Sequence, residues 1–190
     1  MKRILLPLLM SLPMFVAAED LHVSSPDGDL KVTLSDNDGK LTYTVTYKEH
    51  SIIEPSPLGF IANVGDYTQG AKLVNHETRV RDEHYTLNRS KVSDVHYVAN
   101  GLWALCEYPD GRQMSLSFWV SNNNIAFKYM PRPIGEIRCA VIQSEATGFD
   151  FPEGTTTFLT PQSAPMAGWK RSKPSYEEEY VADEPMGTPS

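Results

Sequence analysis

Residues 41–47 read Leu41-Thr-Tyr-Thr-Val-Thr-Tyr47, an unbroken alternation of large apolar or aromatic residues with threonines. In an extended chain successive side chains point to opposite faces of a sheet, so the threonines line one face and the other residues line the opposite face. β-branched and aromatic residues also favour strands over helices. This stretch therefore predicts a β-strand with one buried face, and it decides in favour of a β fold.

The residues before this stretch complete a hairpin. Leu30 to Leu34 alternates in the same way, and Asp36-Asn-Asp-Gly39 lies between the two segments. Asn, Asp and Gly are the residues that tight turns prefer. We therefore expect the two segments to pair as an antiparallel β-hairpin.

The same alternation recurs along the rest of the chain, whereas helical periodicity is nearly absent. Pro109-Asp-Gly111 and Asn122-Asn-Asn124 predict turns, and the polar residues Asn63 to Gly70 predict a loop. Many short strands separated by turns indicate an antiparallel sandwich of roughly a dozen strands. The further expected strands are Val92–Val98, Leu102–Tyr108, Met114–Val120, Ile125–Met130, Ala140–Thr147 and Thr155–Leu159.

Large apolar side chains within these runs predict the core. Trp103 and Trp119 sit in strand patterns, which favours buried positions over exposed ones. The apolar surface of the predicted strands is large enough to form a real core. The other candidates are Leu105, Phe118, Phe127 and Tyr129.

The chain begins with the pattern of a secretory signal peptide. Basic residues precede an apolar run from Ile4 to Val16, and small residues follow it, which places cleavage between Ala18 and Glu19. The run is too short to span a bilayer as a helix. We expect residues 1–18 to be removed and the remainder to be exported to the periplasm.

The charge of the chain argues against two classes of partner. The net charge is −7, and it becomes −9 once Lys2 and Arg3 are removed. A nucleic-acid-binding domain needs a basic surface, and an anionic membrane repels an acidic protein. We expect neither nucleic acid nor a membrane as a partner.

Motifs for catalysis are weak in this sequence. There is no nucleophile elbow and no phosphate-binding glycine loop. The five histidines lack the spacing of a zinc motif, although His84 and His96 could approach each other across a sheet. Cys106 and Cys139 could form a disulfide in an oxidising compartment or remain free thiols.

The C-terminal part of the chain carries the candidate binding residues. In Tyr176-Glu-Glu-Glu-Tyr180 a strand would place Glu177 and Glu179 on one face, where their carboxylates offer the hard oxygen donors that calcium accepts. A solvated acidic run is the competing interpretation. Trp169 follows Gly168 after a proline-rich stretch, and its ring is a candidate for stacking on a sugar or for packing within the domain.

Five segments occur in an order and spacing that resemble the N-terminal domain of glycoside hydrolase family 97. The resemblance covers nearly all of the chain after residue 18. The segments are Ser25-Pro-Asp-Gly-Asp-Leu-Lys-Val32, Leu41-Thr-Tyr-Thr-Val-Thr-Tyr-Lys48, Glu54-Pro-Ser-Pro-Leu-Gly59, Asn123-Asn-Ile-Ala-Phe-Lys-Tyr129 and Pro174-Ser-Tyr-Glu-Glu-Glu-Tyr180.

The resemblance implies a large antiparallel β-super-sandwich of the galactose-mutarotase-like kind over residues 19–180, with residues 181–190 leading towards a (β/α)₈ barrel. Members of the family act on α-glucosidic or α-galactosidic bonds and use calcium. The barrel supplies the catalytic carboxylates, and the N-terminal domain lends one glutamate to the ion. By position this glutamate is Glu177, with Glu178 and Glu179 less favoured.

The 190 residues contain no barrel, so the resemblance implies an N-terminal fragment that is catalytically silent alone. Its expected partners are the barrel of the same enzyme and an α-linked glucoside or galactoside. Two other functions stay open. One is an independent carbohydrate-binding module that uses Trp169. The other is an aldose-epimerase-like enzyme, which needs a histidine and a carboxylate in one cleft.

Overall fold

The computed structural model describes residues 20–137, 139–159 and 181–188. These residues form thirteen β-strands and one short 3₁₀ turn, and neighbouring strands in each sheet run antiparallel. None of the described residues forms a helix long and apolar enough to cross a bilayer. The expected all-β antiparallel fold is confirmed.

The first sheet is a meander of four strands in the order β1-β2-β3-β4. Val32 of β2 faces Val45 of β3, and Leu34 faces Tyr43. All four side chains are buried, so the predicted hairpin and its buried face are confirmed, with a 3₁₀ turn at Asn37–Gly39 between the strands. The strands are β1 (Leu21–Ser24), β2 (Leu30–Ser35), β3 (Thr42–Tyr47) and β4 (His50–Pro57).

The second sheet is a meander in the order β10-β9-β8-β7. The single strand β8 contains most of two expected strands, Val92–Val98 and Leu102–Tyr108. Its pairing with β7 continues without a break across the residues between them. The expected turn at residues 109–111 lies between β8 and β9. The turn expected at 122–124 joins β9 to β10, and its last residue, Asn124, is already the first residue of β10. The strands are β7 (Lys72–Thr86), β8 (Asp94–Glu107), β9 (Gln113–Ser121) and β10 (Asn124–Pro131).

Two small sheets complete the described fold. β11 (Ile142–Glu145), β5 (Phe60–Ala62) and β6 (Gly65–Asp66) form one, so the loop expected at Asn63–Gly70 contains a short strand. β12 (Thr156–Leu159) pairs with β13 (Val181–Pro185) in the other.

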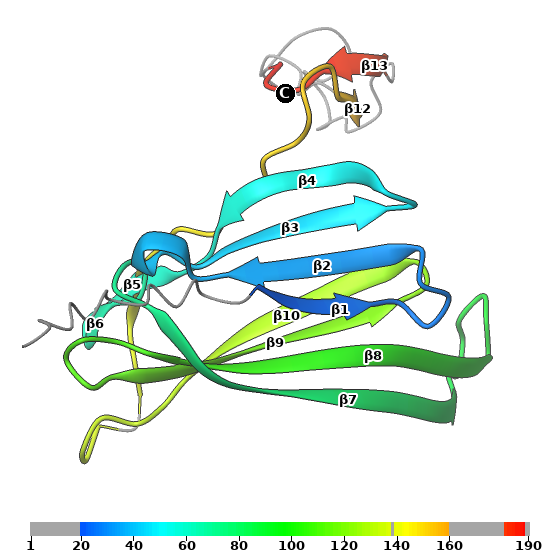
Figure 1. Ribbon diagram of the computed structural model, residues 1–190. Coiled ribbons are helices and arrows are strands. Elements are labelled where there is room, and N and C mark those ends of the chain that lie inside the picture. Colours follow the sequence, from blue (N-terminus) through cyan, green and yellow to red (C-terminus); the bar gives the residue numbers. More distant parts are fainter. Residues whose placement is uncertain (1–19, 138, 160–180, 189–190) are drawn as a thin grey trace, which may run out of the picture.

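The two four-stranded sheets lie face to face, and their facing sides make the core (Figure 1). Even-numbered residues from Leu102 to Cys106 on β8 and from Met114 to Val120 on β9 are buried towards the first sheet. Phe118 packs there against the Tyr43 ring at a centroid distance of 6.1 Å. Residues of the small β5–β6 region close one end of this core. Its largest fully buried side chains are Leu34, Leu41, Leu58, Tyr67, Leu102, Met114, Leu116 and Phe118.

The expected burial of both tryptophans in the core is wrong. Trp103 and Trp119 are half-buried and lie outside the core cluster, as does Leu105. In a strand alternate residues face opposite sides, and the core side is taken by Leu102 on β8 and by Phe118 on β9. The tryptophans therefore lie on the outer side of the second sheet. Phe118, by contrast, is a core residue, as expected.

Candidate functional site

The residues that the sequence favours for binding, Trp169 and Glu177, lie outside the described residues. The two strands that flank them in sequence are described. Leu159 at the end of β12 pairs with Val181 at the start of β13. The β12–β13 pair therefore joins the chain before residue 160 to the chain after residue 180.

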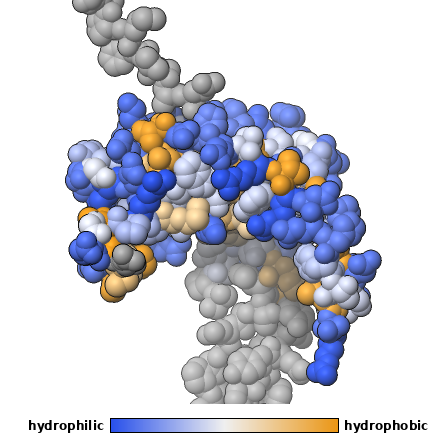
Figure 2. Space-filling view, turned by 90° about the horizontal axis from the view of Figure 1, so that it is seen from below, coloured by the Kyte–Doolittle hydropathy of each residue, from blue (hydrophilic) through white to orange (hydrophobic). Residues whose placement is uncertain are grey.

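The outer side of the second sheet carries a shallow groove of about 250 Å³. Trp103 and Trp119 line it, together with the cationic side chains of Arg79, Arg81 and Lys128. On the side of the molecule that carries this sheet, the surface is largely hydrophilic and hydrophobic side chains gather in small separate groups (Figure 2). The groove is therefore a polar, cationic surface rather than an apolar pocket.

The ring of Trp119 is already in contact with other residues of the chain. It covers Gly101, its register partner on β8, so closely that a Cβ at Gly101 would lie 2.7 Å from the ring. The guanidinium of Arg81 lies 4.5 Å from the ring centroid, a distance typical of a cation–π contact. A sugar that stacked on this ring would have to displace Arg81.

A second aromatic cluster surrounds Arg112 at the β8–β9 turn. Its guanidinium lies 4.6 Å from the ring centroid of Tyr67 and 5.2 Å from that of Tyr108. Its Nε donates to a carboxylate oxygen of Asp110 at 2.6 Å, and this hydrogen bond lowers the pKa of the Asp110 carboxyl. Burial raises the pKa of the Tyr108 hydroxyl. The cluster fastens the turn to the loop after β6, which is a packing role.

The structure records both cysteines as free. Cys106 is fully buried on the core side of β8, whereas Cys139 is exposed. Burial raises the pKa of the Cys106 thiol to about 12. Of the two arrangements left open by the sequence, the structure contains the free thiols.

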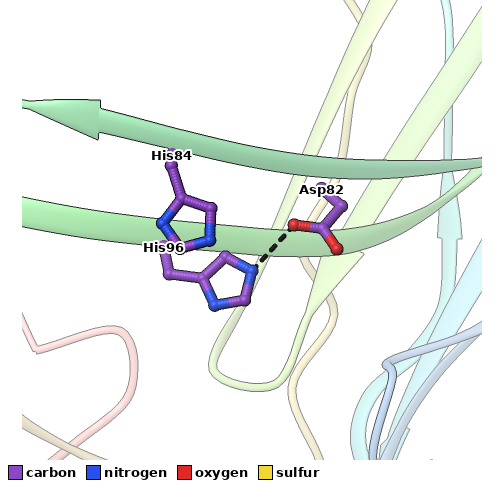
Figure 3. A group of neighbouring side chains, drawn as sticks. All are labelled: Asp82, His84 and His96. Atoms are coloured by element: carbon purple, nitrogen blue, oxygen red, sulfur yellow. Dashed lines mark hydrogen bonds and ion pairs between the residues drawn. The ribbon is translucent and has the colours of Figure 1, made fainter.

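His84 and His96 meet across the β7–β8 ribbon, as the sequence allowed. They are register partners, and their rings stack with a centroid distance of 3.9 Å and an interplanar angle of 13°. Nε2 of His96 lies 2.7 Å from Oδ1 of Asp82 (Figure 3). The side chains of His96 and Asp82 are 51% and 63% exposed. This histidine–carboxylate pair lies on an open surface, not in the closed cleft that the epimerase alternative needs.

Comparison with known proteins gives relatives that are much longer than this chain. The chain is 25% identical over 170 residues to a retaining α-galactosidase of Bacteroides thetaiotaomicron, which covers 88% of this chain and 24% of that protein. It is 26% identical over 132 residues to a probable retaining α-galactosidase of Streptomyces bingchenggensis. The chain spans about a fifth to a quarter of the length of these curated relatives.

Solved structures share the fold. A β-arabinopyranosidase is 45% identical and superposes with a TM-score of 0.76 over 88% of this chain and 27% of its own. A glycoside hydrolase family 97 enzyme from Pseudoalteromonas sp. strain K8, in complex with panose, is 20% identical with a TM-score of 0.69. It covers 74% of this chain and 22% of its own length. The family model described as the glycosyl-hydrolase 97 N-terminal domain matches residues 23–190, and the chain belongs to this family.

Proposed function

We propose that this chain is the N-terminal carbohydrate-associated domain of a calcium-dependent α-glycosidase. Its role is to support a catalytic (β/α)₈ barrel, to border the active site and to donate one calcium ligand, and it is catalytically silent alone. The observation that carries the proposal is the family match over residues 23–190, joined to relatives of which this chain spans only about a quarter.

Glu177 is the proposed calcium ligand. A carboxylate oxygen is a hard donor of the kind that calcium binds, and a calcium shell contains about six to eight oxygen atoms. One carboxylate leaves most of that shell to the barrel, so the chain does not hold the ion by itself. A ligand delivered from a neighbouring domain makes the ion a link between the two domains.

Trp169 is the proposed sugar-bordering residue. The other two tryptophans are half-buried in the outer groove of the second sheet, and the ring of Trp119 is covered by Arg81 and Gly101. Trp169 is the remaining tryptophan of the sequence. An indole ring combines a flat apolar face with a polar edge, which suits a pyranose.

The proposed substrate is an α-linked galactoside or a sugar of the same ring configuration, with an α-linked glucoside as the alternative. The relatives include a retaining α-galactosidase and a β-arabinopyranosidase. β-L-Arabinopyranosides have the same configuration as α-D-galactosides at every ring carbon and lack only the C6 hydroxymethyl group. One pocket shape in the barrel therefore suits both.

The signal pattern at residues 1–18 supports export, and we propose the periplasm as the location. Edman sequencing or intact-mass measurement of the secreted chain tests the cleavage site. A mature N-terminus at Glu19 is expected.

The proposal is tested on the protein encoded by the complete reading frame, after sequencing the DNA that follows codon 190. A frame that encodes a (β/α)₈ barrel is expected. In that complete protein, Glu177→Gln should weaken calcium binding by about tenfold or more, because the ligand charge of a site sets its affinity. Glu178→Gln is the matched control and should leave calcium affinity near the wild-type value.

Three results would overturn the proposal. One is the absence of a barrel-encoding frame. Another is tight calcium binding by the isolated 190-residue chain in isothermal titration calorimetry. The third is a Glu177→Gln protein whose calcium affinity and α-galactosidase activity are unchanged. Sugar binding by the isolated chain that is lost in Trp169→Ala would instead identify an independent carbohydrate-binding module.

A further inference from the structure

The β7–β8 ribbon places three metal-ligand side chains on one face. His84 and His96 are directly opposed in the register, and opposed residues of an antiparallel pair hold their Cβ atoms about 4.5–5.5 Å apart. Asp82 precedes His84 by two residues on β7, and residues two apart in a strand share a face. The three side chains therefore form a triangle across two neighbouring strands (Figure 3).

The distances within this triangle suit a small cation. One candidate ligand atom from each of Asp82, His84 and His96 lies within 4.8 Å of the other two. In a tetrahedral shell with bonds of about 2.0–2.2 Å, ligand atoms are separated by about 3.3–3.5 Å. To reach that geometry, the widest separation must shrink by at most about 1.5 Å.

The side chains are free to make that adjustment. All three are exposed, so rotation about their χ angles meets no packed core. The stacked histidine rings must tilt apart for both nitrogens to point at one ion. Nε2 of His96 and Oδ1 of Asp82 already lie 2.7 Å apart. A metal ion would take the place of the proton between them, and the two atoms would move apart by about 0.6 Å or more to bind one ion.

We propose that Asp82, His84 and His96 form a binding site for a divalent transition-metal cation, of which Zn²⁺ is the representative. Two imidazoles and a carboxylate are a donor set that zinc, copper and nickel accept. Calcium prefers oxygen donors and is a poor occupant of this site. Three protein ligands leave the remaining positions of the shell to water.

This site uses other residues than the calcium ligand of the proposed function. It is built by β7 and β8, whereas Glu177 follows β12 in the sequence and precedes β13. The two ions also differ in donor chemistry. Zinc binding here can therefore succeed or fail independently of the calcium proposal.

A bound ion would cross-link β7 and β8 near the loop that connects them. Residues 87–93 connect β7 to β8 just beyond the site. An ion that binds the folded ribbon more tightly than the unfolded chain stabilises the fold by mass action. Zinc should therefore raise the melting temperature of the protein.

The test is isothermal titration calorimetry of the 190-residue chain with Zn²⁺ near neutral pH, together with thermal unfolding followed by circular dichroism. The same measurements are made on His84→Ala and His96→Ala. His76→Ala is the matched control, because His76 lies on the same face of β7 but opposes Ala104. These histidines are exposed, so the variants are expected to fold, and far-ultraviolet spectra verify it.

We expect one zinc ion per chain and a rise in melting temperature on zinc addition. Loss of a supporting contact alone typically weakens a metal site about 10–100-fold, so removal of His84 or His96 should weaken binding at least that much. Acidification should also release zinc, since protons compete for imidazole nitrogens. Ca²⁺ should produce neither heat nor stabilisation at this site.

The proposal is overturned if zinc binding survives both His84→Ala and His96→Ala, or if His76→Ala weakens it as much as they do. It is also overturned if the wild-type chain shows no saturable zinc binding. In that last case the three residues form only a surface ion pair with a stacked neighbour.

Discussion

At the scale of single residues, the surroundings of a side chain decide its chemistry, and the two cysteines illustrate this. Both belong to apolar runs in the sequence. Cys106 lies on the core side of β8 with no exposed surface, and burial raises the pKa of its thiol to about 12. Cys139 is exposed. Their reactivities should differ strongly because the thiolate is the nucleophile.

The first prediction concerns these thiols. One thiol per native chain should react with a thiol-specific reagent such as DTNB, and a second should react after denaturation. Since the pKa of Cys106 is raised to about 12, its neutral form persists and raising the pH from 7 to about 9 should not make it reactive in the native chain. Cys139→Ser should abolish the native reaction, whereas Cys106→Ala should preserve it. Equal native labelling of both cysteines would contradict the buried position.

The tryptophans show what the sequence could have revealed about single residues. On β9 the residues Ser115, Ser117 and Ser121 share the odd-numbered positions with Trp119, and Phe118 occupies an even-numbered one. The alternation alone therefore assigns Trp119 to the side with the serines. The expected burial of Trp119 rests on its place within a strand, and a strand position alone does not specify which face the side chain occupies. The outer position of Trp119 was predictable from this pattern.

At the scale of elements, β7 is a strand that the sequence pattern does not predict. All but one of the residues in Lys72–Thr86 are exposed, so neither face shows the apolar alternation on which strand prediction rests. Backbone pairing with β8 makes it a strand. The order of polar and apolar side chains does not report this backbone pairing. The position of the Asp82–His84–His96 triangle could not be derived for the same reason, because it depends on the register between two strands.

The second prediction concerns the contact between β8 and β9 at Gly101. Alanine in a strand is ordinarily more favourable than glycine by about 0.5–1 kcal/mol. At this position its Cβ would lie 2.7 Å from the Trp119 ring, so Gly101→Ala should destabilise the fold by about 1–3 kcal/mol through overpacking. Urea unfolding measures the change.

A double-mutant cycle separates the clash from other effects. In a Trp119→Ala background the obstacle is gone, and Gly101→Ala should become neutral or stabilising. The same destabilisation in both backgrounds would mean that the ring does not press on Gly101.

At the scale of the whole molecule, the two four-stranded sheets are held together by a shared apolar layer. The centroids of the Phe118 ring and its neighbours lie 6.1 Å apart for Tyr43 on β3 and 5.5 Å apart for Phe127 on β10. Phe118 therefore contacts the opposite sheet as well as its own. The alternation in residues 41–47 predicted this layer correctly, because it assigned a buried face to one strand of the first sheet.

The third prediction follows from this layer. Phe118→Ala should lower the free energy of unfolding by about 3–5 kcal/mol, since a large fully buried ring is removed. Val80→Ala is the control: Val80 is 72% exposed, and the change should stay within about 0.5 kcal/mol. Tryptophan fluorescence and circular dichroism should give coincident urea transitions, because both sheets depend on one core. Separate transitions would indicate that the sheets unfold independently.

β7 is an edge strand of its sheet, and this position has a consequence for solubility. A long edge strand offers unpaired backbone groups to which a second chain can add, and this is a common route to aggregation. One face of β7 carries two ion pairs, Arg79 with Glu77 at 2.8 Å and Arg81 with Glu83 at 3.3 Å. An approaching strand would have to desolvate these ion pairs. The charged residues that make β7 hard to predict as a strand therefore also oppose edge-to-edge pairing of β7 with a strand of a second molecule.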